Sequence, residues 1–392
     1  MAAPAYSPAD RAAAEFWMDR ALQLARQGEA LASPNPMVGA VLVRDGQIVG
    51  EGFHTYDARR HAEVIALAVA GGAARGATLY INLEPCCHTG RTAPCTEALL
   101  AAGVHRVVAA MADPNPAVSG RGFAQLRAAG VEGETGVRQE QARRLNEGFA
   151  RWITARRPLL TLKSALTLDG QIVLPDRADK SRRARRVTWI TSEESREEVQ
   201  RMRHATDALL TGIGTILADD PRLTDRTGRP RRRRLLRVVM DSRLRLPVKS
   251  RLVKEAEGDV LVFTRQAPDT PRARALRRAG VEVVRLRARG NGPDLVAAVE
   301  ELGRREILTV LLEAGGTLNW AALAAGIVDK MFLFYAPKVA GSELMPVLRA
   351  PGGKPRAMRA QSAFPALRSL TAYRFGPDLA VEGYLRDVYR DH

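Results

Sequence analysis

The sequence predicts two consecutive α/β domains. At 392 residues the chain is long enough for two or three domains, each with its own hydrophobic core. Short apolar β runs alternate with segments of helical period along the whole chain. The alternation restarts near Arg156-Arg157-Pro158, where a helical segment ends and a new strand begins. We therefore place the two domains at residues 1–156 and 157–392.

The first domain is predicted to have the order α-β-β-α-β-α-β, with helices on both faces of a sheet. A helix in residues 7–30 begins near Ser7 or Asp10, either of which can cap it. Two β runs in residues 37–54 flank Asp45-Gly46, a dipeptide typical of a hairpin turn. A short helix follows in residues 61–72 and a strand in residues 76–86. Residues 96–116 contain a second helix and then the last strand.

The second domain follows a predicted helix in residues 139–157. Its strands are predicted from apolar runs in residues 159–170, 207–212, 236–241, 259–264, 281–286, 308–316 and 328–341. Its helices are predicted from the 3.6-residue period in residues 192–205, 271–280 and 294–305.

Composition excludes several classes of protein. The apolar runs are far shorter than the roughly 20 residues that span a bilayer, and the N-terminus does not resemble a secretory signal, so we expect a cytoplasmic protein. The net charge of +17 is concentrated in two runs, Arg182–Arg186 and Arg229–Arg237, without interleaved aromatic residues. A solvated loop is the favoured interpretation of these runs; a phosphate-attracting rim and a nucleic-acid patch are the alternatives.

The strongest chemical motif joins His61-Ala62-Glu63 to the cysteines Cys86, Cys87 and Cys95. Cysteines confined to ten residues favour a metal site over a disulfide framework. Catalytic zinc takes three protein ligands and one water, and zinc deaminases add a glutamate that transfers protons. We assign His61, Cys86 and Cys95 as ligands, Glu63 as the proton carrier, and Cys87 as a packed or free thiol. The alternative is that these residues are simply buried.

The stretches "PNPMVGAVLV", "HAEVIAL" and "EPCCHTGRTAPC" resemble the deaminase half of the bifunctional riboflavin-biosynthesis deaminase–reductase family. That family has the same long insertion between its two cysteines, although serine is more usual at the position of Cys87. By position, the resemblance implies substrate contacts at Asn35, His54, His88 and Arg91. The alternatives are that Asn35 only shapes a turn, that the histidines pack as ordinary polar residues, and that Arg91 is a surface residue.

The second domain has no Rossmann fingerprint. Gly212 and Gly214 lie in a possible phosphate loop, but Leu217 stands where a third glycine would fall. The backbone amides of Gly315, Gly316 and Thr317 follow a strand and enter a helix, where they could face an anion. The strand end Asp241-Ser242-Arg243 suits a ribose 2′-phosphate and favours NADP over NAD.

The stretches "LKSALTLDG", "WITSEESREEVQRMRHATDALLTGIGTILADDPRLTDR" and "LLEAGGTLN" are similar to the reductase half of the same family. The resemblance implies a cytidine-deaminase-like α/β/α domain followed by a dihydrofolate-reductase-like α/β domain. It implies NADP contacts at Ala165, Trp189, Thr215, Asp219, Ser242, Gly315, Gly316 and Thr317. It implies substrate contacts or active-site roles at Lys163, Asp169, Arg203, Leu223, Arg226 and Glu313.

The reductase half also departs from the family pattern. Val187 occupies a position where the family usually has a substrate-contacting serine, and "DKSRRARR" replaces a glycine-serine stretch. Alternatives to the implied roles are surface arginines at Arg203 and Arg226, core packing at Trp189 and Leu223, and a structural ion pair at Lys163 or Asp169.

The sequence therefore predicts two successive reactions of riboflavin biosynthesis. The first is zinc-dependent deamination of a diamino-(ribosylamino)pyrimidinone 5′-phosphate, and the second is NADPH-dependent reduction of its ribosyl group to ribityl. We expect one Zn²⁺ per chain, NADPH, a small-molecule substrate and a homo-oligomer, with neither nucleic acid nor membrane as partner. The rivals are a nucleotide or tRNA deaminase with an accessory domain, and a nucleic-acid-binding protein with a structural metal. The long cysteine spacing disfavours the first, and three ligands instead of four disfavour the second.

Overall fold

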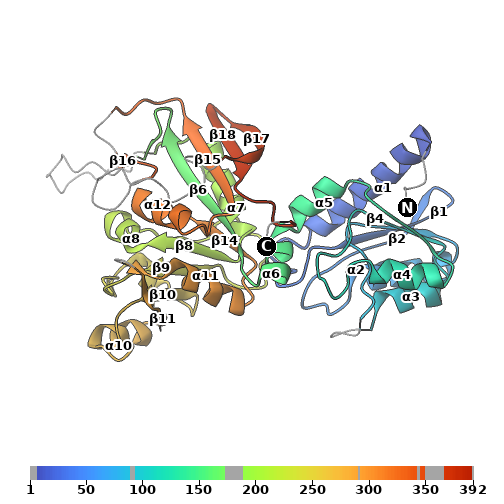
Figure 1. The fold of residues 1–392 in the computed structure, drawn as a ribbon, viewed down its shortest axis with the longest axis horizontal. Helices are drawn as coiled ribbons and strands as arrows, with labels where there is room; N and C mark the ends of the chain where they lie inside the picture. The colour runs from blue at the N-terminus through green and yellow to red at the C-terminus, as the bar shows by residue number, and fades with distance from the viewer. Residues whose placement is uncertain are drawn as a thin grey trace. The chain divides into compact units, whose positions relative to one another are not determined.

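The computed structural model describes residues 7–88, 93–172, 189–289, 292–341, 345–348 and 366–390 (Figure 1). Its contacts divide the chain into two compact units. Unit 1 consists mainly of Met1–Ala155, and unit 2 mainly of Arg156–Arg229 and Arg234–Asp391. Within the described residues, no helix has both the length and the apolar character needed to cross a membrane.

Unit 1 is built on a five-stranded sheet with the order β2-β1-β3-β4-β5. Strand β1 pairs antiparallel with β2 and β3, whereas β3, β4 and β5 are parallel to one another. Asp45 and Gly46 both have positive φ, as a two-residue turn between β1 and β2 requires, so the predicted hairpin is confirmed. The strands are β1 (Gly39–Arg44), β2 (Gln47–Phe53), β3 (Thr78–Ile81), β4 (Arg106–Ala109) and β5 (Glu132–Thr135).

Helices cover both faces of this sheet, as predicted. A Cβ on Gly39 of β1 would lie 2.2 Å from the Ala21 carbonyl of α1 (Pro8–Arg26). A Cβ on Gly52 of β2 would lie 2.5 Å from the Ala62 carbonyl of α2 (Ala62–Ala70). Gly52 pairs with Ala40, the neighbour of Gly39, and neighbouring strand residues face opposite sides. Helices α1 and α2 therefore pack on opposite faces at closest approach.

The predicted helix in residues 139–157 is divided in two. Asn146 separates α5 (Gln139–Leu145) from α6 (Glu147–Ala155). Its side-chain amide accepts a hydrogen bond from Met37 N at 2.8 Å and donates one to Met37 O at 2.9 Å. This tertiary contact interrupts the helix where the residue period alone predicts continuity. The other helices of unit 1 are α3 (Cys95–Ala102), α4 (Arg121–Ala128) and the 3₁₀ turn η1 (Gly71–Ala74).

Unit 2 is built on a nine-stranded sheet with the order β11-β10-β9-β8-β14-β6-β15-β18-β17. Neighbours from β11 to β15 are parallel, and β18 and β17 continue the sheet antiparallel. Its strands are β6 (Leu159–Thr167), β8 (Ala208–Gly212), β9 (Leu236–Met240), β10 (Val260–Thr264), β11 (Val281–Arg285), β14 (Thr309–Leu312), β15 (Lys330–Ala336), β17 (Arg368–Phe375) and β18 (Asp378–Tyr384). Four two-residue strands form two further ladders: β7 (Gln171–Ile172) with β16 (Met345–Pro346), and β12 (Ala288–Arg289) with β13 (Gly292–Pro293).

Each face of the large sheet has its own hydrophobic core. Consecutive residues of β8 illustrate this, because Leu209 packs in one core and Leu210 in the other. Leu210 shares its core with residues of α11 (Leu295–Arg304) and α12 (Gly316–Ala324), and Leu209 with residues of α8 (Ile213–Asp219), α9 (Arg251–Lys254) and α10 (Pro271–Arg278). Residues of α7 (Glu193–His204) pack against Phe332 and Phe334 of β15. The sequence predicted most of these elements but not the hairpin of β17 and β18.

The basic run Arg229–Arg237 is not a uniformly solvated loop, contrary to the favoured interpretation. Its last residue lies in β9, where Arg237 is 1% exposed. The guanidinium group donates to Asp259 Oδ1 at 2.6 Å and to the carbonyls of Glu255 and Arg222. Arg237 is thus a structural ion-pair residue. The other basic run, Arg182–Arg186, lies outside the described residues.

Because Gly52 lies so close to the backbone of α2, adding one methyl group there should destabilise unit 1. Gly52→Ala would place Cβ 2.5 Å from a backbone carbonyl of α2, which cannot move away without shifting the helix. We expect unit 1 to lose about 1–3 kcal/mol of unfolding free energy, as overpacked cores do. Gly72→Ala is the matched control, because a Cβ there meets nothing within 4 Å. Denaturant unfolding of both variants measures the difference, and equal stability would contradict the packing argument.

Candidate active sites

Three potential metal ligands meet in unit 1. The ligand atoms of His61, Cys86 and Cys95 all lie within 4.8 Å of one another. His61 Nδ1 is 3.0 Å from Cys95 Sγ and 3.5 Å from Cys86 Sγ. These separations suit side chains sharing one zinc ion, whose Zn–S and Zn–N bonds are about 2.3 and about 2.1 Å. Cys87 is not a member of this cluster within the described residues.

The starts of two helices and the loop after one strand bring these side chains together. His61 is the N-cap residue of α2, and Cys95 is the first residue of α3. Cys86 lies in the loop after β3, where Thr96 N donates to its carbonyl at 3.2 Å and Cys95 N to its sulfur at 3.4 Å. The long segment between the cysteines is therefore closed at its base by the start of α3.

Within the cluster Cys86 has the electrostatics of a metal-binding thiolate, whereas hydrogen bonding to Cys86 and burial raise the pKa of Cys95. Hydrogen bonding with Cys95 and His61 outweighs burial and lowers the pKa of the Cys86 thiol to about 4. A thiolate is the form of cysteine that binds metal. One imidazole and two sulfur ligands, leaving a fourth position open, form the donor set of a catalytic zinc site.

Glu63 lies in the first turn of α2, two residues after His61, and is 4% exposed. Burial raises the pKa of its carboxyl group, although the charge of His61 opposes this effect. A carboxyl group in this setting can take up and release a proton, as a general acid–base residue must. The helix turn thus places an ionisable group beside the metal ligands.

Asn35 and His54 form a pair next to the cluster. His54 Nδ1 lies 2.9 Å from the Arg60 carbonyl, which can only accept, so Nδ1 carries the proton. Burial lowers the pKa of His54, so in its neutral form Nε2 accepts from Asn35 Nδ2 at 3.0 Å. The His54 and His61 rings meet edge to face at 5.5 Å. Asn35 Oδ1 therefore remains the available hydrogen-bond acceptor of this amide.

Two buried residues that sequence reasoning missed support these loops. Asn82 accepts from Gly39 N and donates to Met37 O, which holds the segment after Asn35. Glu84 accepts hydrogen bonds from three backbone amides, those of Asp113, Gly120 and Phe123. Both follow β3 in the sequence, but their partners lie 29 to 45 residues away, so no local pattern indicates them.

The remaining predicted residues of unit 1 are less defined. His88 is exposed at the end of the described segment, and Arg91 lies outside the described residues, as does Val187 in the second half of the chain.

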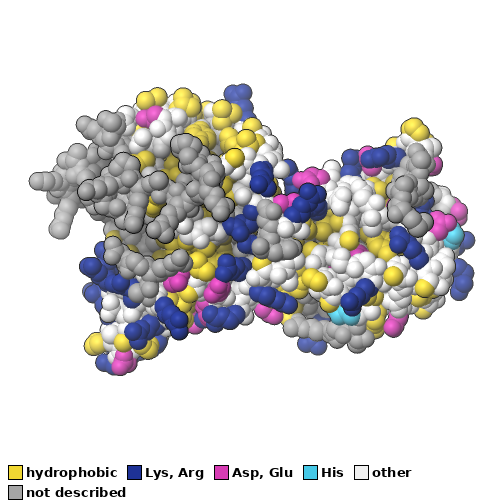
Figure 2. Space-filling model, viewed as in Figure 1, with side chains coloured by type: hydrophobic (Ala, Val, Ile, Leu, Met, Phe, Trp, Pro, Cys, Tyr) yellow, Lys and Arg dark blue, Asp and Glu magenta, His cyan; other side chains and the backbone are white. Residues whose placement is uncertain are grey.

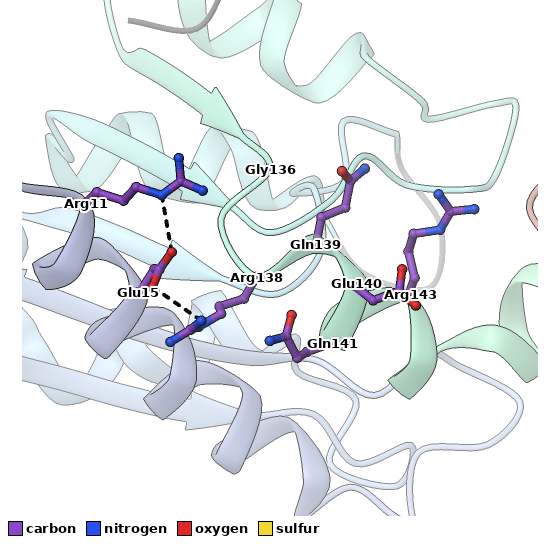
Figure 3. A pocket seen from close by; sticks show the side chains of 8 residues that line it. All are labelled: Arg11, Glu15, Gly136, Arg138, Gln139, Glu140, Gln141 and Arg143. Atoms are coloured by element: carbon purple, nitrogen blue, oxygen red, sulfur yellow. Dashed lines mark hydrogen bonds and ion pairs between the residues drawn. The ribbon is translucent and has the colours of Figure 1, made fainter. Parts of the chain in front are cut away.

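A cavity of about 350 Å³ lies elsewhere in unit 1 (Figure 3). Its walls include the ion pairs of Glu15 with Arg11 and Arg138, and it contains none of the predicted site residues.

In unit 2 the structure brings together three residues that the sequence singled out. Lys163 Nζ lies 3.1 Å from Glu313 Oε2, and the Arg203 guanidinium binds both carboxylate oxygens at 2.7 and 3.0 Å. Arg203 also donates to the Thr224 carbonyl at 3.1 Å. These side chains come from β6, α7 and the end of β14, and each is between 11 and 13% exposed. The cluster therefore combines two cations with one anion in a mostly buried position.

The Glu313 cluster carries more positive than negative charge. Burial would raise the pKa of the Glu313 carboxyl, but the charges of Arg203 and Lys163 lower it to about 2. Glu313 is therefore ionised throughout the neutral range, and the three groups together carry one net positive charge. That charge is suited to an electron-rich or anionic group of a ligand.

Several predicted cofactor residues lie at or just after the carboxyl ends of the parallel strands. Gly315 caps α12, and Gly316 and Thr317 form its first turn, directly after β14 and Glu313. Thr215 and Asp219 belong to α8, which begins at the end of β8. Ala165 lies in β6, and Ser242 follows β9. Ligands of parallel α/β sheets bind beyond this edge.

Three predicted residues have contacts that constrain their roles. Asp169 accepts hydrogen bonds from the backbone amides of Ala340 and Gly341 and thereby joins the loops after β6 and β15. Trp189 is 55% exposed, with the Arg196 guanidinium 4.9 Å from its ring centre. The Leu223 side chain is 5% exposed and packs in a hydrophobic core, so its backbone is the part that can face a ligand.

A buried pair that sequence reasoning missed holds the loop carrying Leu223 and Arg226. His204 Nδ1 lies 2.9 Å from Asp225 Oδ2, and Thr227 Oγ1 donates to Asp225 Oδ1 at 2.8 Å. His204 is 2% exposed, whereas the Arg226 side chain on the same loop is exposed. The pair is separated by 21 residues and has no motif that would reveal it.

Comparison with known proteins identifies both halves of the chain. Residues 11–111 match the cytidine and deoxycytidylate deaminase zinc-binding region, and residues 158–381 match the RibD C-terminal domain. The chain is 39% identical to riboflavin biosynthesis protein RibD of Escherichia coli over 94% of this chain and 98% of that protein. It is 40% identical to the RibD of Aquifex aeolicus over 84% of this chain and 88% of that protein.

Two solved structures match nearly the whole chain. Acinetobacter baumannii RibD matches with a TM-score of 0.81 and 34% identity, covering 95% of this chain and 99% of that one. A Thermotoga maritima diaminohydroxyphosphoribosylaminopyrimidine deaminase/5-amino-6-(5-phosphoribosylamino)uracil reductase matches with a TM-score of 0.77 and 33% identity, over 95% and 99% of the two chains. The predicted fold class, a cytidine-deaminase-like domain followed by a reductase α/β domain, is confirmed.

The Glu313 cluster predicts an unusual dependence of stability on pH. Glu313→Gln would leave Arg203 and Lys163 without a buried counter-charge, which typically costs about 3–5 kcal/mol of unfolding free energy. Because the pKa of Glu313 is lowered to about 2, its contribution is complete above the unfolded-state pKa and is lost as pH falls toward 2.

The loss of stability should therefore be largest at neutral pH and should diminish between about pH 4 and pH 2, as measured by denaturant unfolding. Glu300→Gln is the control, because Glu300 pairs with Arg157 at the surface and should contribute less than about 1 kcal/mol. A pH-independent difference for Glu313→Gln would contradict the assigned charge state.

Proposed function

The chain belongs to the RibD family of bifunctional deaminase–reductases of riboflavin biosynthesis, and we propose that each unit carries out one of the two reactions. The deaminase site is the His61 cluster of unit 1, and the reductase site is the Glu313 cluster of unit 2. The observation that carries this proposal is that each unit gathers, at one place, ionisable residues distant in sequence whose chemistry fits one of the reactions.

In the first reaction, water replaces the amine of a 2,5-diamino-6-(ribosylamino)pyrimidinone 5′-phosphate. A zinc ion bound by His61, Cys86 and Cys95 would supply a water molecule acidified enough to attack the ring carbon near neutral pH. Glu63 accepts the proton of this water and delivers it to the departing nitrogen, so that the C–N bond breaks and ammonia leaves. The burial that raises the pKa of Glu63 supports this double role, because the protonated form is then accessible.

Asn35 and His54 orient the pyrimidine beside these groups. His54 fixes the Asn35 amide by accepting from Nδ2, so Oδ1 is presented to a donor on the substrate. An amide with a fixed orientation distinguishes a ring N–H or amino group from a ring carbonyl. We extend the substrate contacts to His88 and Arg91 from the family resemblance alone.

In the second reaction, C1 of the ribosyl group, opened as an imine, would accept a hydride that bound NADPH would supply, and the imine nitrogen would accept a proton from solvent. The cofactor supplies the hydride, so the protein contributes mainly position and electrostatics. The net positive charge of the Lys163, Arg203 and Glu313 cluster attracts the polar sugar phosphate. Most of the Arg203 guanidinium already serves Glu313 and Thr224, so the exposed Arg226 is the better phosphate ligand.

The cofactor would lie along the carboxyl edge of the large sheet. The amides at the start of α12, next to Glu313, can face its phosphates, as helix starts commonly do. Ser242 at the end of β9 supports NADPH over NADH, because its hydroxyl can donate to a 2′-phosphate.

The metal assignment predicts different effects for three cysteine variants. Cys86→Ser and Cys95→Ser should each lose zinc and ammonia release, because each removes one of three ligands. Cys87→Ser is the matched control and should keep one zinc per chain and full activity. Elemental analysis of purified protein provides the measurement. A metal-free Cys87 variant beside a metal-loaded Cys95 variant would reverse the ligand assignment.

The Glu63 assignment predicts a variant that binds metal but does not deaminate. Glu63→Gln keeps the shape of the side chain but cannot accept a proton, so ammonia release should fall by a factor of about 10²–10⁴. The experiment supplies the diamino-pyrimidinone phosphate and follows ammonia, then supplies the deaminated pyrimidine and follows NADPH consumption.

Reduction of the deaminated pyrimidine is the internal control and should proceed at the rate of the unmodified protein. Ammonia release at the unmodified rate would remove Glu63 from the mechanism. Failure of the unmodified protein to release ammonia or consume NADPH would refute the assignment of the two reactions to the two units.

A further inference from the structure

Three arginines surround a hollow at one end of the large sheet. Arg265, Arg285 and Arg287, together with Leu286, line a cavity of about 250 Å³. Arg265 directly follows β10, Arg285 is the last residue of β11, and these two strands are parallel neighbours. The cavity therefore lies at the carboxyl ends of the parallel strands, the same end of the sheet at which the Glu313 cluster lies. Lys and Arg side chains are prominent in the space-filling view over the part of unit 2 that contains β10, β11 and α10 (Figure 2).

These arginines form no ion pair among the described residues. Of the nearby acidic side chains, Glu282 binds Arg305, and Asp241 Oδ2 accepts from Leu246 N while Asp241 Oδ1 is buried without a hydrogen-bond partner. The Nε atom of Arg265 is buried and has no hydrogen-bond acceptor. Leaving a buried donor unsatisfied is costly, and three like charges around one hollow repel one another. An anion in the cavity would reduce this repulsion and accept hydrogen bonds from the guanidinium groups that line it.

Ser242 lies on the same stretch of the edge. In the sheet Met240 pairs with Phe263, so Ser242 follows β9 at the position where Arg265 follows β10. A Cβ placed on Gly292 would lie 3.8 Å from Ser242 Oγ, and Gly292 begins the strand of the small hairpin that follows Arg287. The Ser242 hydroxyl and the arginine cavity are thus parts of one polar surface.

The position of this surface matches one end of a dinucleotide. Along the edge, the Gly315 loop follows β14, and β8, β9 and β10 come next in order. Three strand spacings of about 4.8 Å separate the Gly315 loop from the arginine cavity by about 14 Å. An extended dinucleotide is long enough to reach from one to the other. If the hydride-donating end lies at Glu313, the adenosine end lies at the arginines.

We propose that Arg265, Arg285 and Arg287, with Ser242, bind the 2′-phosphate of NADPH and determine the preference for NADPH over NADH. The proposal rests on the NADPH-dependent reduction proposed for unit 2 and names the residues that make the distinction. A phosphate monoester carries close to two negative charges and accepts paired N–H donors from guanidinium groups. NADH has a hydroxyl at this position and would leave the three cations uncompensated.

A binding experiment without turnover tests the proposal on the full chain. Calorimetric titration compares adenosine 2′,5′-bisphosphate with adenosine 5′-monophosphate, which differ only in the 2′-phosphate. The unmodified protein should bind the bisphosphate more tightly. Arg265→Ala and Arg285→Ala should each weaken bisphosphate binding about tenfold to hundredfold and leave binding of the monophosphate unchanged.

Arg278→Ala is the matched control. Arg278 is exposed at the end of α10, just before β11 begins, so it lies toward the amino ends of the parallel strands. Its replacement by alanine removes the same charge as the other two variants. It should leave both affinities unchanged. Arg285 is exposed, so its variant should fold normally even where loss of Arg265 disturbs the sheet.

Steady-state rates with both cofactors separate the possible failures. Equal kcat/KM for NADPH and NADH in the unmodified protein would refute the proposed NADPH preference itself. A clear NADPH preference that Arg265→Ala and Arg285→Ala both retain, with unchanged bisphosphate binding, would overturn the arginine assignment and leave the proposed reduction standing. Loss of bisphosphate binding in Arg278→Ala as well would indicate a general charge effect and would also overturn it.

Discussion

Parallel strand pairing constrains where chemistry can occur in this protein. Parallel neighbours align their carboxyl ends, so the loops that follow them converge on one edge of a sheet. In unit 2 this single constraint gathers Glu313, Ser242 and Arg265, which follow three different strands. In unit 1 the loop after β3 carries Cys86 toward the start of α3 in the same way. In unit 1 the starts of α2 and α3 supply His61, Glu63 and Cys95, whereas in unit 2 Arg203 comes from the last turn of α7.

Within this framework, the two sites differ in how they manage buried charge. In unit 1 the pKa of Cys86 is lowered while burial raises that of Glu63, so the two groups are shifted in opposite directions. That difference suits a metal ligand beside a proton carrier. In unit 2 the Glu313 carboxylate stays ionised between two cations, which leaves no proton to exchange near neutral pH. This environment suits binding and orientation of a ligand more than acid–base catalysis.

The sequence predicted what short-range patterns encode. His61 and Glu63 lie in one helix turn, Asp45-Gly46 specifies a turn, and apolar runs mark the strands. It could not reveal groupings that depend on tertiary pairing. Glu84 meets amides 29 or more residues away, and Asn146 breaks a helix because Met37 contacts it. The hairpin of β17 and β18 was missed because most residues of β17 are exposed, which removes the apolar alternation that marks a half-buried strand.

The arginine side chains show most clearly what the structure adds to the sequence. The net charge of +17 was ambiguous, because paired arginines and ligand-binding arginines look identical in a sequence. In the structure they separate: Arg237 is buried against Asp259, and Arg203 against Glu313. Their charges are compensated within the fold and contribute to stability. Arg265 is also partly buried, but its Nε has no hydrogen-bond acceptor, and it forms no ion pair among the described residues. A buried cation that the protein itself does not neutralise is most simply explained by an anion that arrives from solution.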